Sequence, residues 1–80
     1  MPFIFRFKNF IIRFWYSMEE NRMHVHAISG EANVKIWLEP EVEVASIKGR
    51  VSAAMVNELV REVKKHEQLC KDAWNAYLGK

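Results

Sequence analysis

The chain has 80 residues, half of them apolar, and a formal net charge of +2. This length allows one hydrophobic core and predicts a single domain over residues 1–80, while the apolar content excludes a disordered chain. The net charge is too low to indicate nucleic-acid binding by itself. The charge is also unevenly placed, because residues 18–47 carry six acidic and two basic side chains between two basic flanks. Such a distribution suits oriented docking on a partner.

Cys70 is the single cysteine of the chain. No intrachain disulfide is therefore available, which indicates a reducing, cytoplasmic location. The apolar run at the N-terminus is interrupted by Arg6, Lys8 and Arg13. A signal peptide needs an unbroken apolar stretch and a membrane-spanning helix needs about 20 apolar residues, so we expect no membrane association.

The first half of the chain alternates in hydrophobicity with a period of two, which is typical of β-strands. We predict strands over residues 3–8, 10–17, 23–28, 32–38 and 42–47. Either Ser29-Gly30 or Gly30-Glu31 forms a two-residue hairpin turn, since glycine supplies the positive φ that such turns need. Pro40 marks another turn, because proline does not fit inside a central strand.

The second half of the chain has apolar residues at helical spacing. It predicts a helix from about 52 to 78, broken or kinked near 65–67, with Ser52 as its N-cap and Gly79 as its stop. Strands followed by helix indicate an α+β fold. We expect an antiparallel sheet of four to five strands, packed on one face by a C-terminal helix or kinked helix pair.

The alternation also assigns the two faces of the predicted sheet. The apolar set should meet the helix and comprises Phe10, Ile12, Phe14, Tyr16, Val25, Ala27, Val34, Ile36, Leu38, Val42 and Val44. The opposite face collects Arg13, Trp15, His24, His26, Asn33, Lys35, Trp37 and Glu43. With one helical element available, we expect much of this second face to be open. Exposed aromatic residues often mark a contact site.

His24 and His26 project from the same side of one predicted strand, about 7 Å apart along the backbone. One interpretation is general acid–base catalysis such as RNA cleavage, with one imidazole as base and the other as acid. Lys35 or Arg13 would then stabilise the phosphate charge. The alternative, which we favour, is that the two imidazoles pack against tryptophans or form hydrogen bonds near the turn.

A metal site is not predicted, and neither is any other cofactor. Two strand histidines provide two ligands, whereas structural zinc takes four. His66 and Cys70 are spaced i, i+4 and could form a second pair. Their helix face also carries Val63 and Trp74, however, and therefore points to the core. Cys70 is better interpreted as a small buried apolar group.

Trp15 and Trp37 lie beside Arg13 and Lys35 on the predicted second face. Stacking aromatics with neighbouring cations suit single-stranded RNA. The same residue types are also enriched at interfaces with a partner protein or in a homodimer. For so short a chain, we favour the protein interface.

The chain resembles the small bacterial family known as the domain of unknown function numbered 4160, over nearly its whole length. The resemblance is carried by Met1-Pro2, His24-Val25-His26, Gly30-Glu31-Ala32, the apolar strand ending at Leu38, His66-Glu67-Gln68-Leu69 and Trp74. It implies one α+β domain that acts in a small two-protein module of toxin–antitoxin type. By this resemblance, His24, His26, His66 and Trp74 are the positions to test, and His66 and Trp74 could equally pack the helix on the sheet.

Our leading interpretation is therefore a cytoplasmic component of a toxin–antitoxin-like pair. Its partner would be a small protein encoded nearby, either the antitoxin or the toxin, bound through the open sheet face. The alternatives are RNA binding or cleavage that uses His24 and His26, and a non-catalytic homodimeric binding module. A ribonuclease-like activity is the less favoured of these interpretations.

Overall fold

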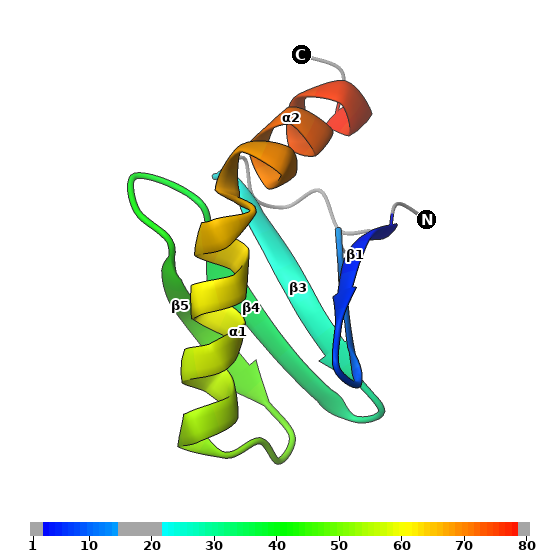
Figure 1. Ribbon diagram of the computed structural model, residues 1–80, viewed down its shortest axis with the longest axis vertical. Helices are drawn as coiled ribbons and strands as arrows, with labels where there is room; N and C mark the ends of the chain where they lie inside the picture. The colour runs from blue at the N-terminus through cyan, green and yellow to red at the C-terminus, as the bar shows by residue number, and fades with distance from the viewer. Residues whose placement is uncertain (1–2, 15–21, 79–80) are drawn as a thin grey trace.

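A computed structural model describes residues 3–14 and 22–78 of the chain. These residues form five strands and two helices in the order β1–β5, α1, α2 (Figure 1). Their bounds are β1 Phe3–Phe7, β2 Phe10–Arg13, β3 His24–Ser29, β4 Ala32–Trp37, β5 Glu43–Lys48, α1 Ala53–Lys65 and α2 Glu67–Leu78. The predicted α+β fold is confirmed. The predicted strand positions 15–17 and the predicted helix stop Gly79 lie outside the described residues.

The strands form one antiparallel sheet in the order β1-β2-β3-β4-β5. Each strand is therefore hydrogen-bonded to its neighbour in sequence, as in a meander. Ser29 pairs with Ala32, so the β3–β4 hairpin turns through Gly30 and Glu31. Gly30 has a φ of 57°, the positive value expected for this turn. The second of the two predicted hairpin turns is the observed one.

Two helices follow the sheet, as the prediction of a kinked helix pair with a break near 65–67 allowed. The Ser52 hydroxyl accepts a hydrogen bond from the Met55 backbone N–H at 3.0 Å, which caps the start of α1 as predicted. α1 ends at Lys65 with His66 as its C-cap, and α2 begins directly after it at Glu67. In Figure 1, α1 lies across one face of the sheet, whereas α2 leaves at an angle and extends past the sheet's upper end.

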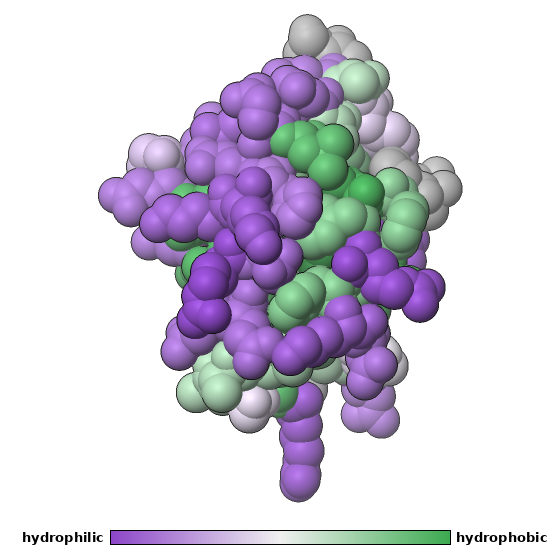
Figure 2. All heavy atoms as spheres, in the orientation of Figure 1, coloured by the Kyte–Doolittle hydropathy of each residue, from purple (hydrophilic) through white to green (hydrophobic). Residues whose placement is uncertain are grey.

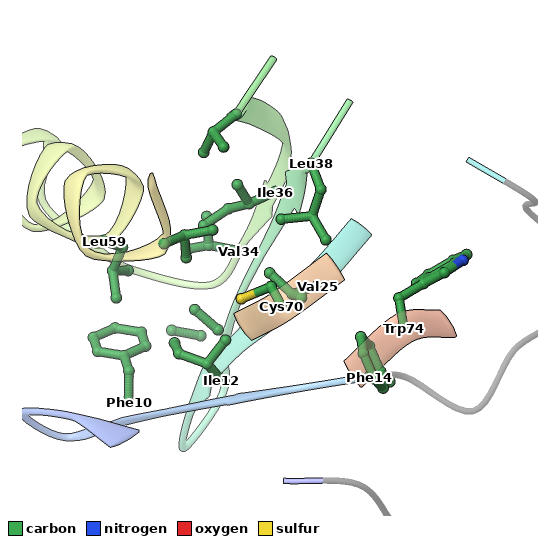
Figure 3. Packing of buried hydrophobic residues seen from close by; sticks show 14 residues of the cluster. Phe10, Ile12, Phe14, Val25, Val34, Ile36, Leu38, Leu59, Cys70 and Trp74 are labelled. Carbon is green, nitrogen blue, oxygen red and sulfur yellow. The ribbon is translucent and has the colours of Figure 1, made fainter. Parts of the chain in front are cut away.

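The hydrophobic core lies between the sheet and the two helices (Figure 3). Ile12, Val25, Val34 and Ile36 are fully buried from the sheet side, and Leu59, Val63 and Cys70 are fully buried from the helices. Every described residue of the predicted apolar face belongs to this cluster or packs against it. Tyr16, the remaining member, lies outside the described residues. Period-two alternation thus identified the core face correctly.

Two contacts connect α1 and the end of β5 to the turns of the sheet. Figure 2 shows polar residues over the outward side of α1 and hydrophobic residues gathered between α1 and β1. Lys8 in the β1–β2 turn forms a 2.8 Å ion pair with Glu58 of α1. At the other edge, Gly49 follows β5 with a φ of 83° and approaches the Glu31 backbone in the β3–β4 turn. The first contact links α1 to the β1–β2 turn, and the second brings the end of β5 against the β3–β4 turn.

Candidate binding face of the sheet

The polar set predicted from alternation does share one side of the sheet, which we call the distal face because it lies away from α1. Arg13 pairs with His26, and His26 pairs with Lys35. These three side chains thus form a row across β2, β3 and β4. Directly opposed positions in a sheet bring side chains into contact, so the row concentrates cationic groups beside a histidine.

Trp37 is the centre of the neighbouring row of the distal face. It pairs with His24 on one side and Glu43 on the other. The Arg22 guanidinium carbon lies 4.0 Å from the centre of the Trp37 ring, and the Lys35 Nζ lies 4.6 Å from it. Both distances are within the range of cation–π attraction. The indole is half-buried, so part of this aromatic and cationic arrangement is accessible to a partner.

His24 and His26 lie edge-to-face with ring centres 5.4 Å apart. Contrary to the expectation of an open face, both are buried, with 6% and 9% of their surfaces exposed. His24 Nδ1 donates to the Arg22 carbonyl oxygen at 2.7 Å, and His26 Nδ1 donates to Asn33 Oδ1 at 2.8 Å. Because each acceptor is a carbonyl oxygen, each bond places a proton on Nδ1 and directs Nε2 away from that acceptor.

Burial is the main reason that the pKa of His26 falls below its ordinary value. The hydrogen bond to Asn33 opposes this effect, since it favours the charged ring, while positive charge on His24, Lys35 and Lys48 lowers the pKa further. His26 is therefore neutral at pH 7 and can accept a proton.

Arg13 places a second cation at the edge of the histidine pair. Its Nε is buried and has no hydrogen-bond acceptor among the described residues. A guanidinium donor without an acceptor carries a desolvation cost that an incoming anionic group would remove. Trp15, the other aromatic residue predicted for this face, lies outside the described residues.

The residues predicted from the helix take separate places. The His66 ring stacks on Phe5 of β1 with centres 4.4 Å apart. The ring of Trp74 in α2 packs against those of Phe14 and His24, with ring centres 5.7 Å and 5.2 Å away, respectively. Both helix residues thus pack on the sheet, and Trp74 also connects α2 to the histidine pair. Cys70 is fully buried, and burial raises the pKa of its thiol to about 11.

Arg22, Asn33 and Trp74 complete the surroundings of the histidine pair. Neither a role for Arg22 nor the contact between Trp74 and His24 was predicted from the sequence. The period-two pattern placed Asn33 on the same face as His26, but it did not predict the hydrogen bond between the two side chains. Arg22 precedes β3 and carries no periodic signal. The contact with Trp74 depends on the angle between α1 and α2, which a pattern of hydrophobicity does not specify.

No group of three or more His, Cys, Asp or Glu side chains in residues 3–14 and 22–78 is placed to hold a metal ion. Within the same residues, neither helix is long and apolar enough to cross a membrane.

Comparison with known protein families assigns the chain to one of them. Residues 9–75 match the family described as "Domain of unknown function (DUF4160)". The chain belongs to this DUF4160 family. No curated protein and no solved structure matches it significantly. The match runs from the start of β2 into α2 and so includes the distal face and the helix residues that contact it.

Proposed function

We propose that this DUF4160 protein is the binding component of a toxin–antitoxin-like pair and contacts a small partner protein, encoded nearby, through the distal face. The observation that carries the proposal is the half-buried Trp37 ring with Arg22 and Lys35 against it. Tryptophan and arginine are the residue types that most often dominate the energy of protein interfaces. The single buried cysteine makes a reducing, cytoplasmic setting part of this proposal.

Beside Glu43, which already lies 3.6 Å from Arg22, the distal face carries several cations, and these favour a partner surface that supplies carboxylates. Arg13 and Lys35 lie in one row with His26 between them, and Arg22 lies beside Trp37. A carboxylate at the edge of this surface would accept hydrogen bonds from guanidinium groups, which are stronger than bonds between neutral groups. The interface would then have an aromatic centre and a cationic rim, as stable interfaces often do.

Co-purification of the chain with the neighbouring gene's product tests this proposal. Trp37→Ala should abolish the complex, because it removes the central ring and the support of two cations. Tyr77→Ala is the matched control, since Tyr77 is a partly exposed aromatic residue of α2 that stacks on Phe14. Size-exclusion chromatography measures both. Complex formation that survives in Trp37→Ala would refute the distal face as the binding surface.

RNA cleavage is a second candidate function, and it is favoured by the geometry of the histidine pair. Two imidazoles with centres 5.4 Å apart are each oriented by an Nδ1 hydrogen bond, and Lys35 lies directly opposite His26. His26, neutral at pH 7, would act as the base, His24 as the acid, and Lys35 with Arg13 would stabilise the phosphate charge.

A single pair of variants separates cleavage from binding. His26→Ala should abolish RNA cleavage while the partner complex persists, whereas Trp37→Ala should abolish the complex. Circular dichroism establishes that each variant is folded. Unchanged cleavage in folded His26→Ala would end the catalytic candidate.

A further inference from the structure

The outer edge of β5 is an exposed strand edge. Among the strands of residues 3–14 and 22–78, β5 is the last of the sheet and has a neighbour, β4, on one side (Figure 1). Its residues are exposed or half-buried, and Ile47 exposes 48% of its surface. An exposed strand edge presents backbone donors and acceptors that another strand can pair with. We propose that β5 pairs antiparallel with β5 of a second copy, so that two sheets join into one across a two-fold axis.

The sequence of β5 is complementary to itself in this orientation. If two copies of Glu43–Lys48 align antiparallel end to end, Glu43 lies opposite Lys48 of the second copy, and Val44 lies opposite Ile47. Glu43 and Lys48 pair in β4 with Trp37 and Asn33, so they share the distal face. The alignment therefore places opposite charges in register on one face of the joined sheet, which stabilises a strand pair.

The β-bulge in β5 gives the other face a matching apolar pair. Between Lys35 and Ile36 the partners in β5 jump from Ser46 to Val44, so Ala45 is the extra residue. The bulge places both Val44 and Ile47 opposite core positions of β4, Ile36 and Val34. In a regular strand, residues three apart would face opposite sides. Apolar side chains therefore meet apolar side chains across the proposed axis.

The backbone groups of Val44 and Ile47 are oriented to form the new strand pair. Ser29 and Ala32 close a two-residue hairpin and are a hydrogen-bonded pair of the β3–β4 ladder. The direction of the backbone N–H and C=O groups alternates along β4, so Val34 and Ile36, like Ala32, direct theirs to β3. Their partners in β5, Ile47 and Val44, therefore direct their own backbone groups away from β4. Val44 and Ile47 are opposed in the proposed dimer, and so their outward groups pair with each other.

Sedimentation equilibrium of the full chain is the first test. The wild-type chain should sediment at twice its mass of 9.5 kDa at high concentration. Ile47→Lys should shift it to the monomer, whereas Leu69→Lys should not, although Leu69 of α2 exposes a similar 47% of its surface. A monomeric wild-type chain would overturn the proposal, as would a dimer that resists Ile47→Lys.

Charge exchange gives the decisive version of the test. Glu43→Lys and Lys48→Glu should each raise the dissociation constant of the dimer about tenfold or more. Each variant creates a like-charge contact, and two-fold symmetry makes that contact occur twice in the dimer. An equimolar mixture of the two variants should form a heterodimer, since every Glu–Lys contact is then restored. Thermal unfolding shows that both variants are folded, which matters because Glu43 also lies 3.6 Å from Arg22. Two folded variants that stay monomeric when mixed would refute the alignment.

The dimer does not rest on the proposed function. Trp37→Ala should abolish the partner complex and leave the dimer intact, while Ile47→Lys should do the reverse. Failure of the partner complex therefore leaves the β5 pairing standing, and failure of the dimer leaves the distal face as a candidate binding surface.

Discussion

Replacing Gly49 by alanine should destabilise the fold far more than the same replacement at Gly30. Both glycines have positive φ, 83° and 57°, where an L-residue costs about 1–2 kcal/mol. At Gly30 the added Cβ meets nothing within 4 Å. At Gly49 it would lie 2.7 Å from the Glu31 carbonyl oxygen and 2.9 Å from the Ala32 Cα. Those atoms belong to the backbone of the hairpin and do not rotate away.

We therefore expect Gly30→Ala to lose about 1 kcal/mol of unfolding free energy, because the restricted unfolded chain returns part of the cost. Gly49→Ala should lose about 3 kcal/mol or more, since the β5 end must also separate from the β3–β4 turn. In a domain of this size, the Tm should fall by about 4–8 °C for Gly30→Ala and by more than about 12 °C for Gly49→Ala. Equal losses for the two variants would refute the close approach of Gly49 to the hairpin.

Three further predictions test the core and the buried groups. Leu59→Ala should cost about 2–5 kcal/mol because Leu59 is fully buried between α1 and the sheet, while Leu69→Ala should cost about 0.5 kcal/mol or less, as urea unfolding can show. The contribution of His26 to the unfolding free energy should be fully present above about pH 6.5 and should be lost as the pH is lowered, because the pKa of His26 is depressed in the folded state. His26→Gln should flatten this dependence of the unfolding free energy on pH. Cys70 should react with a thiol reagent only when the chain unfolds, since it is buried and its pKa is raised to about 11.

The fold was largely predictable because its hydrophobic pattern is local. Alternation in the strands assigned Ile12, Val25 and Val34 to the core face, and all three are fully buried. The Gly30 turn and the Ser52 cap are also read from neighbouring residues. The bulge at Ala45 was not predicted, since a shift between two strands is a property of their pairing and leaves no mark in one strand's alternation.

The candidate site was predictable in position and less so in environment. Strand geometry placed His24, His26, Lys35 and Trp37 on one face, and the register brings them together. Their burial was missed, because it depends on segments far away in sequence. Trp74 reaches His24 from α2, about fifty residues downstream. Hydrophobic spacing predicted a break in the helix, but the direction that α2 takes after the break is set by packing.

The burial of the histidine pair separates the two candidate functions by their response to pH. Positive charge on His24 lowers the pKa of His26, so the two rings resist carrying a proton each. A pair that holds one proton is what acid–base cleavage needs, and its rate should pass through a maximum and fall on both sides. Binding through Trp37 has no such requirement, because the indole does not titrate and arginine stays charged. A partner complex that is unchanged from pH 6.5 to 8.5, beside a bell-shaped cleavage rate, would assign binding to Trp37 and cleavage to the histidines. A flat cleavage profile over that range would place the acid and base elsewhere.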